Sequence, residues 1–251
     1  MTGSASTAGQ GFMLRLLPSF GLTWAGKPSA IPVRAQRLVV LLALAGRPLQ
    51  RGVVASRLWP EVVNSRANAS LRATLWSLPR DIPAIVVIEN NLLAIHPGVD
   101  LELAEARELA LSIIEGNHGV EQATRARALL TEDLLPDWTE DWLDIERDLF
   151  RQLRLHALDA LCVGLAEARH YASAIAVGLA SVACEPTRES AHRALMAAHL
   201  MEGNRMEALR AYHGYLELAR REMGIGPSGQ MEALLQAALA DDARYESITL
   251  R

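Results

Sequence analysis

The sequence predicts a mainly α-helical protein with a small β component, in which a small mixed domain is followed by an all-helical one. Three observations support this fold class. Ala and Leu dominate while aromatic residues make up 5% of the chain, which favours helix over sheet. Strand-like runs are confined to the first hundred residues, where they surround three helical segments. Beyond Gly98 the pattern is helical throughout, with breaks at Gly and Pro.

The two parts also carry opposite charge. Residues 1–100 contain ten Lys and Arg against four Asp and Glu, a net charge of +6. Residues 101–251 contain fifteen Lys and Arg against twenty-five Asp and Glu, a net charge of −10. A basic domain joined to an acidic one indicates that the first half meets a polyanion. The alternative is two ordinary domains with uneven surfaces.

The first domain is expected over residues 12–98. Residues 1–11 are rich in Ser, Thr, Gly and Ala and lack the apolar core of an export signal, so we expect a flexible leader there. Short strands are predicted over 13–20, 22–24 and 31–33, with turn residues between the last two.

Three helices are predicted after these strands. The first spans residues 34–45, the second 53–59, where Pro60 stops it, and the third 65–78, with Ser65 as its N-cap. An apolar stripe of the third helix recurs at helical spacing: Ala67, Leu71, Leu75 and Leu78.

A hairpin is predicted next, because the β-rich runs 85–88 and 92–95 flank the turn Glu89-Asn90-Asn91. The order of small sheet, three helices and hairpin is typical of a winged helix-turn-helix domain. In that arrangement the last helix enters the major groove of DNA and the hairpin forms the wing.

Polar side chains of the third helix are the candidate DNA contacts. The forks of Arg66 and Arg72 suit guanine, and Asn68 suits adenine. Serine hydroxyls bond phosphate or base, and an indole packs on sugar or a thymine methyl. The full set in this region is Arg66, Asn68, Ser70, Arg72, Trp76, Ser77 and Arg80. The alternative interpretation is a solvated helix face.

Other residues are predicted to support binding from outside this helix. Arg34, Arg37 and Arg51 lie near helix starts, where they would hold phosphates. Asn90 and Asn91 would reach the groove from the wing, weakly, because the tip carries an acid and no Arg. Solvated surface charge and an ordinary surface turn are the alternatives.

The second domain is expected over residues 99–251 and shows a weak internal repeat. Ala174-Ile175 and Ala208-Leu209 lie 34 residues apart, each early in a predicted helix that follows a short break. This period is typical of tetratricopeptide repeats, in which helix pairs bury their apolar faces by stacking. An irregular helical bundle is the alternative.

Several function classes have little support. The apolar run 38–45 is under half of the roughly 20 residues that span a bilayer. The two cysteines are expected to be buried thiols, and the seven histidines match no metal-binding pattern. Glycine-rich phosphate loops and nucleophile motifs are absent from the sequence. We therefore expect no enzyme activity, cofactor, metal or membrane association, and a cytoplasmic location.

The sequence resembles a known family, the Streptomyces antibiotic regulatory proteins. In the first half the resemblance rests on residues 58–61 (LWPE) and 70–78 (SLRATLWSL). In the second half it is more specific and matches the bacterial transcriptional activator domain of these proteins. The matching segments there are residues 135–138, Trp142, 146–147, 154–158, 188–193, 202–205, 207–209 and 222–228.

The resemblance implies an OmpR-like winged helix followed by a tetratricopeptide-type domain. It also implies a bacterial transcriptional activator that binds repeated promoter sites and recruits RNA polymerase, often for a secondary-metabolite gene cluster. Repeated sites would favour a homodimer on DNA, and DNA binding would place the protein on the nucleoid when bound. The matched recognition-helix positions are Ser70, Arg72, Trp76, Ser77 and Arg80.

The sequence departs from the family pattern in that same helix. Family members often carry Asn at the position of Ser70 and basic residues at those of Ser77 and Pro79. Fewer basic groups give weaker phosphate anchoring. The competing function is therefore a tetratricopeptide-type protein-interaction adaptor whose winged helix no longer binds DNA specifically.

Overall fold

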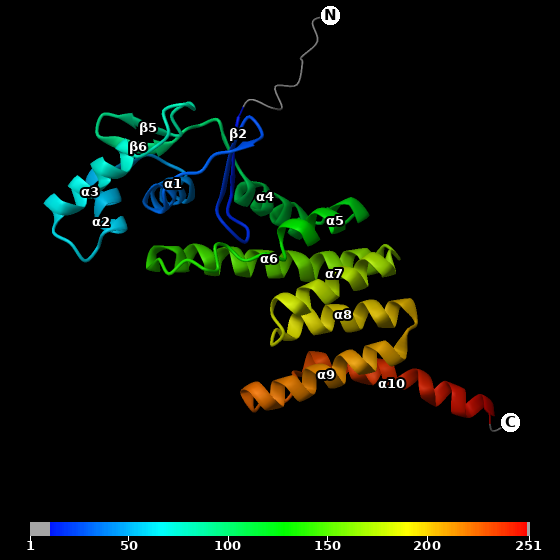
Figure 1. Ribbon diagram of the computed structural model, residues 1–251. Helices are drawn as coiled ribbons and strands as arrows, with labels where there is room; N and C mark the ends of the chain where they lie inside the picture. Colours follow the sequence, from blue (N-terminus) through cyan, green and yellow to red (C-terminus); the bar gives the residue numbers. More distant parts are fainter. Residues whose placement is uncertain (1–10, 250–251) are drawn as a thin grey trace, which may run out of the picture. The chain divides into compact units, whose positions relative to one another are not determined.

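The structure, a computed structural model, describes residues 11–249, with side chains as far as residue 240 (Figure 1). Apart from Gly11, the predicted leader lies outside the described residues. The chain forms two compact units, the first from residues up to Glu105 with Leu134–Arg147, the second from Ala106–Asp133 with residues from Asp148 onwards. The predicted domains were single continuous stretches, whereas each unit is assembled from two.

One sheet of the first unit gathers strands from both ends of that unit. Its order is β3-β2-β1-β7, with β1 parallel to β7 and antiparallel to β2. The strands are β1 (Phe12–Arg15), β2 (Gly21–Trp24), β3 (Lys27–Pro28) and β7 (Val99–Leu101). Along β1, Phe12 and Leu14 are buried while Met13 and Arg15 are exposed, so one face of the strand meets the core.

The predicted strand at residues 31–33 is wrong. Helix α1 begins at Val33, and Pro32, with φ −58°, precedes it as the N-cap. A proline has no N–H to donate to a strand ladder, and its fixed φ suits the start of a helix. The apolar character of Ile31 reflects burial at this entry point rather than strand pairing.

The second sheet contains the predicted hairpin. Its order is β4-β6-β5, from β4 (Leu49–Gln50), β5 (Val86–Glu89) and β6 (Leu92–Ile95). Asn90 and Asn91 form a two-residue loop with φ of 46° and 64°. Two consecutive left-handed residues match the twist of an antiparallel pair, and Asn tolerates that conformation well. The hairpin prediction is confirmed.

The three predicted helices of this unit are present, with ends shifted by at most two residues. They are α1 (Val33–Ala45), α2 (Arg51–Leu58) and α3 (Asn64–Trp76). The N-cap prediction for Ser65 is wrong, because Val63 caps α3 and the amides of Arg66 and Ala67 bond to its carbonyl. Ser65 is instead the second residue of the helix.

The apolar stripe of α3 is shorter than predicted. Ala67 and Leu71 are buried, but Leu75 and Leu78 are only half-buried. Thr74 takes the next buried position, and its hydroxyl donates to the Ser70 carbonyl at 2.9 Å. This internal bond satisfies the hydroxyl, which is why a polar residue is tolerated there.

Residues 134–147 complete the first unit, although they come from the second predicted domain. The Arg147 guanidinium donates to the carbonyls of Leu134, Leu135 and Trp138 and so fixes the shape of this segment. The Leu135 amide donates to the Leu16 carbonyl at 3.1 Å, and the Trp138 ring stacks on Phe20 with centroids 6.3 Å apart.

The second unit is helical among its described residues. Its helices are α5 (Val120–Leu129), α7 (Tyr171–Cys184), α8 (Glu189–Glu202), α9 (Arg205–Met223) and α10 (Gly229–Thr249), and α4 (Glu102–Ile114) and α6 (Asp141–Glu167) contribute to both units. Figure 1 shows α7, α8 and α9 stacked in chain order.

The predicted 34-residue spacing recurs in the backbone. Arg169 and Gly203, 34 residues apart, both take left-handed conformations, with φ of 62° and 89°, before α7 and α9. Two amide-to-carbonyl bonds of 2.8 Å share this spacing: His170 to Leu165 and Asn204 to His199. Ala174 and Ala208 are both fully buried. Successive helix pairs are thus joined by the same turn, as in a tetratricopeptide-like fold.

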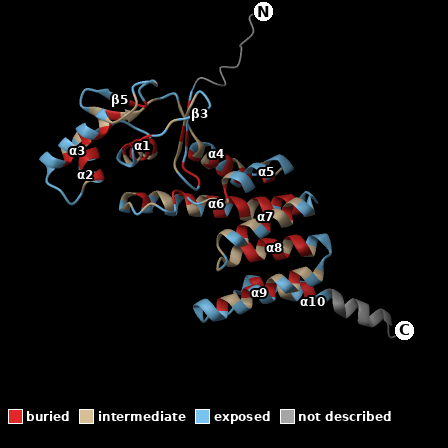
Figure 2. Ribbon diagram, in the orientation of Figure 1, coloured by how far each residue is buried: buried red, intermediate tan, exposed pale blue. Residues whose placement is uncertain are grey.

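Each unit has its own core, drawn in red in Figure 2. In the first unit α1 is buried along most of its length. In the second, one cluster joins α8, α9 and α10: Met196, Ala208, Tyr212, Tyr215, Ala219, Met231 and Ala238. Of the helices described, none is long and apolar enough to cross a membrane. The predicted fold class, mainly α with a small β component, is confirmed.

Candidate nucleic-acid interface

Helix α3 has one buried and one exposed face. Its buried residues are Ala67, Leu71 and Thr74. On the opposite face Ala69 and Ala73 are exposed, one turn apart. Because successive residues of an α-helix are about 100° apart, Arg66 and Arg72 flank this pair of alanines. Between Arg66 and Arg72 the exposed face therefore carries the short side chains of Ala69 and Ala73.

Arg66 and Arg72 are exposed, and within the described part of the chain no hydrogen bond or ion pair engages either guanidinium. A free, exposed guanidinium keeps all its donors available for a ligand. These two side chains lie where the sequence predicted them, on the outer face of the helix.

Trp76 and Arg80 form a second feature at the C-terminal end of α3. Trp76 is 73% exposed, which is unusual for so large an apolar side chain. The Arg80 guanidinium lies 4.8 Å from the centroid of its ring, in a cation–π contact. The sequence predicted both residues separately, but Arg80 lies beyond the helix and reaches this face through the indole.

Arg34 joins the same end of α3 from the first turn of α1. Its Nε donates to the Ser77 hydroxyl at 3.3 Å, and that hydroxyl donates to the Thr74 carbonyl at 2.7 Å. Ser77 is thus the C-cap residue of α3, and its hydroxyl is already engaged. The structure therefore brings Arg34, Trp76 and Arg80 together around one helix end.

The wing and the start of α2 form a separate group. The backbone amide of Arg51 donates to the Asn91 carbonyl at 3.1 Å, which ties the turn to α2. Asn90 and Asn91 are exposed, and Arg51 is half-buried. The predicted wing residues therefore lie together at the β4-β6-β5 sheet. They are separate in the chain from the predicted contacts on α3 and on the residues that follow it.

Two further predicted contacts, Arg37 and Asn68, are also engaged within the protein. The Arg37 guanidinium bonds Glu140 and the Leu58 carbonyl, both at 2.7 Å, so its donors face inward rather than toward a ligand. The Asn68 amide donates to the Asn64 carbonyl at 2.8 Å, one turn back in α3. Ser70 is half-buried beneath this face.

Arg57 is a further exposed cation that the sequence did not single out as a candidate contact. It is exposed in the last turn of α2 and lines a cavity of about 550 Å³ together with Arg37, Pro60 and Trp142. Its position close to the helix break at Pro60 could have indicated a role. Single arginines on short helices are common, however, so such a position carries little information alone.

The thiols of the second unit are poor nucleophiles. Burial, together with the nearby Asp159 carboxylate, raises the pKa of the Cys162 thiol to about 12. Burial also raises the pKa of Cys184. Since the thiolate is the reactive form, neither side chain is activated. Among the described residues no cluster of His, Cys, Asp or Glu has the arrangement to hold a metal ion.

Comparison with known families identifies the helical part of the chain. The model of the bacterial transcriptional activator domain matches residues 100–239. The chain belongs to this family. The resemblance to the Streptomyces antibiotic regulatory proteins is thereby confirmed, and the chain is classed with transcriptional regulators. No curated protein sequence matches the chain.

Among solved structures, the chain is similar to Mycobacterium tuberculosis EmbR in complex with a low affinity phosphopeptide. The TM-score is 0.70 at 20% sequence identity, and the match covers 92% of this chain and 65% of that one. At this identity the similarity shows a shared fold. The family match covers the helical part of the chain, and the shared fold extends over 92% of it.

Proposed function

We propose that this family member is a DNA-binding transcriptional activator that inserts α3 into the major groove of promoter DNA. The observation that carries the proposal is the exposed face of α3, where Arg66 and Arg72 have free guanidinium groups on either side of Ala69 and Ala73. Small residues let the helix axis approach the bases, and the two forks reach base edges or phosphates.

The remaining contacts are assigned around this face. Arg34 and Arg80 hold phosphates at the C-terminal end of α3, with Trp76 packed on sugar or a thymine methyl. Arg51, Asn90 and Asn91 contact the backbone from the wing. Arg37 serves instead as a structural residue, because Glu140 occupies it.

The helical domain supplies the activating contacts in this proposal. Residues 101–251 carry a net charge of −10, so this part repels DNA and suits a protein surface. We infer that it recruits RNA polymerase, and that two protomers occupy repeated promoter sites and gain affinity through effective concentration. We also infer a secondary-metabolite gene cluster as target, a bacterial cytoplasmic location and no enzyme activity, and the family membership supports each of these inferences.

The decisive experiment selects genomic fragments with the purified protein and measures their affinity by fluorescence anisotropy at several salt concentrations. Arg66→Ala/Arg72→Ala should lose binding to the selected fragments. The matched control Arg127→Ala/Arg220→Ala removes two exposed charges from the helical unit and should bind as wild type does. Equal binding by all three proteins, irrespective of sequence, would refute specific recognition by α3.

A second function is favoured by one observation. Helix α3 ends at Trp76, the hydroxyl of Ser77 is already engaged, and Pro79 follows. The last turn therefore offers no free cation of its own, as expected of an adaptor that no longer reads DNA. In that case Arg66→Ala/Arg72→Ala would retain the full transcriptional output in vivo.

Removing residues 1–98 is a poor test of the adaptor function. Residues 134–147 belong to the first unit, and such a deletion would take away the partners of Leu135, Trp138 and Glu140. The double Arg substitution avoids this loss, because both side chains are exposed and neither makes a hydrogen bond or ion pair within the described part of the chain.

A further inference from the structure

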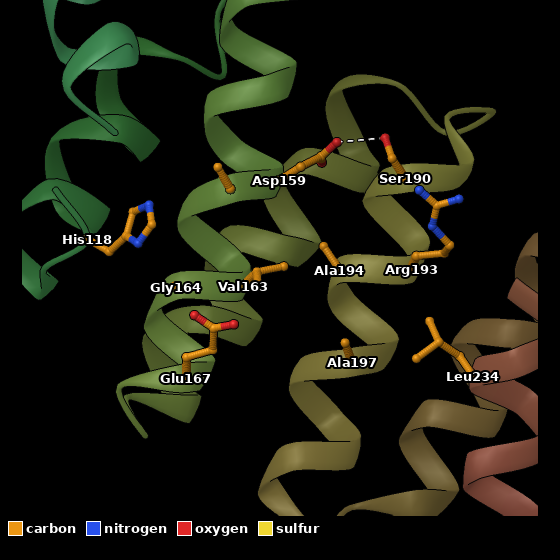
Figure 3. Close-up of a pocket in the computed structure, with 11 residues that line it drawn as sticks. His118, Asp159, Val163, Gly164, Glu167, Ser190, Arg193, Ala194, Ala197 and Leu234 are labelled. Carbon is orange, nitrogen blue, oxygen red and sulfur yellow. Dashed lines mark hydrogen bonds between the residues drawn. The ribbon is translucent and has the colours of Figure 1, made fainter. Parts of the chain in front are cut away.

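An open cavity of about 510 Å³ lies in the second unit, on the side formed by alternate helices of the stack (Figure 3). Its walls come from α6, α8 and α10, with His118 added from the loop between α4 and α5. This volume falls within the range of small-molecule sites in proteins. The DNA-binding proposal makes no use of the cavity.

The floor of the cavity is apolar. It is lined by methyl and methylene groups of short side chains and one leucine: Ala160, Val163, Ala194, Ala197 and Leu234. Val163 remains 37% exposed. An exposed aliphatic floor of this kind gains free energy when an apolar ligand displaces water from it.

One wall carries an acceptor pair made of Glu167 and His118. Glu167 is exposed, and in the region with described side chains its carboxylate has no hydrogen-bond or ion-pair partner. In Figure 3 this side chain rises along α6 toward Gly164, on the same side of the cavity as His118. A free carboxylate beside an apolar floor favours a cation there.

The orientation of His118 is fixed by two contacts. Its Nε2 lies 2.9 Å from the Ile113 carbonyl, which only accepts, so Nε2 carries the proton. Its Nδ1 lies over Gly164, where an added Cβ would come within 1.9 Å. A glycine inside a helix costs about 1 kcal/mol relative to alanine. Here the glycine makes room for an imidazole whose Nδ1 has no hydrogen-bond donor among the described side chains.

The other charged groups of the cavity are neutralised. Asp159 accepts from Ser181 at 2.8 Å, Ser190 at 2.7 Å and Arg188 at 3.1 Å. Arg193 is paired with Glu189 at 3.0 Å and lies on the α8 side in Figure 3, away from Glu167. The unbalanced charge of the cavity is therefore the carboxylate of Glu167.

We propose that this cavity binds a small amphipathic organic cation, an ammonium group on an aliphatic body. The cation pairs with Glu167 and donates to Nδ1 of His118, while the aliphatic body covers Ala194, Ala197 and Leu234. The activator would thus carry an effector site in its helical domain. The site stands independently of the DNA-binding function, since its residues all belong to the second unit.

The test uses the full chain and three probes of equal length that differ only in charge: n-hexylammonium, n-hexanol and n-hexanoate. Binding is followed by NMR of labelled Ala, Val and Leu methyl groups. Hexylammonium should shift the floor methyls with a dissociation constant below about 10 mM. Hexanol should bind about fivefold more weakly, and hexanoate more weakly still.

Two variants locate the charge. Glu167→Gln should weaken hexylammonium about fivefold and leave hexanol unchanged, whereas the control Glu217→Gln, an exposed carboxylate on α9, should change neither. Gly164→Ala should displace His118 and also weaken hexylammonium, with folding checked by circular dichroism. The proposal is overturned if hexylammonium fails to bind, if the three probes bind equally, or if Glu167→Gln binds hexylammonium as wild type does.

Discussion

Arg37 and Glu140 form a two-point ion pair across 103 residues of sequence. Nε of Arg37 lies 2.6 Å from Oε1 of Glu140, and Nη2 lies 2.7 Å from Oε2. The Leu58 carbonyl and the Trp142 indole N–H complete the cluster, at 2.7 and 3.0 Å. A segment of the activator domain is thereby fixed to α1 and to the end of α2, inside the first unit.

Breaking this pair should destabilise the first unit. Arg37→Ala leaves the Glu140 carboxylate, which is only 19% exposed, without its counter-ion, and we expect a loss of about 1–3 kcal/mol in the free energy of unfolding. Urea denaturation followed by tryptophan fluorescence measures it. Arg37→Lys should restore only part of the loss, because an ammonium group cannot bind both carboxylate oxygens in parallel.

The control for this prediction is Arg57→Ala, since Arg57 lines the same cavity and is exposed. Its unfolding free energy should stay within about 0.5 kcal/mol of wild type. If Arg37→Ala and Arg57→Ala were equally stable, the ion pair would contribute nothing measurable.

The sequence predicted the local elements well but missed the contacts that cross the chain. Gly46, Pro60 and Asn90-Asn91 are strong local signals, so the ends of α1, α2 and α3 and the hairpin were placed within two residues. Strand β7 was missed, because its three residues pair in parallel with β1 from the other end of the unit. No periodicity encodes such a partner.

The candidate interface shows the same limit. Exposure of Arg66 and Arg72 followed from helical spacing, which places both outside the stripe of Ala67 and Leu71. The ion pair that engages Arg37 with Glu140, and so removes it from the predicted interface, could not be predicted, because the partner lies 103 residues away. The contact of Arg80 with Trp76 likewise depends on how the chain turns after α3 ends.

The salt dependence of DNA binding should show whether the arginines of α3 contact phosphate groups. Each phosphate contact releases about one counterion, so Arg66→Ala/Arg72→Ala should lower the slope of log K against log salt by about two if both contact phosphate. Anisotropy titrations between low and moderate salt measure this slope. An unchanged slope with weaker binding would assign both residues to base edges instead.

Substitution of Trp76 should weaken DNA binding while leaving the stability of the fold almost unchanged. Its side chain is 73% exposed, so Trp76→Ala should change the unfolding free energy by no more than about 0.5 kcal/mol. Its affinity for a selected operator should nevertheless fall about fivefold, because the packing surface and the anchor of Arg80 are both lost. A variant that binds as wild type does would place Trp76 outside the interface.

Glu189 should make the stability of the second unit depend on pH. Burial alone would raise its pKa, but hydrogen bonds from Ser228 and Tyr215 and the charge of Arg193 outweigh it, so the pKa lies below its ordinary value of 4.5. A depressed carboxylate pKa adds stability that is present above pH 4.5 and is lost as the pH falls through the folded-state pKa.

Comparison with Glu189→Gln tests this coupling. Wild type should be the more stable protein at pH 7, and the difference between the two should narrow as the pH is lowered below 4.5. Urea midpoints between pH 3 and pH 7 give the difference directly. A gap that stays constant over this range would show that the charged form of Glu189 has no preference for the folded state.

Arg154 should be the most sensitive charged residue of the second unit. Its side chain is 2% exposed, and its guanidinium donates to the carbonyls of Leu130 and Thr131 at 3.1 and 3.3 Å and pairs with Asp133. These carbonyls lie just past α5, where a helix end has no partners of its own. Arg154 therefore closes the end of one helix from the middle of another, α6.

Substituting Arg154 by Met keeps much of the buried volume but removes every donor. The two free carbonyls should cost about 2–4 kcal/mol of unfolding free energy, whereas Asp133, whose side chain is 60% exposed, is solvated by water. The exposed Arg127→Ala, on α5 itself, should cost less than about 0.5 kcal/mol. Comparable losses in the two variants would mean that water satisfies these carbonyls once the guanidinium is gone, and that the apolar stem of Arg154 carries its contribution.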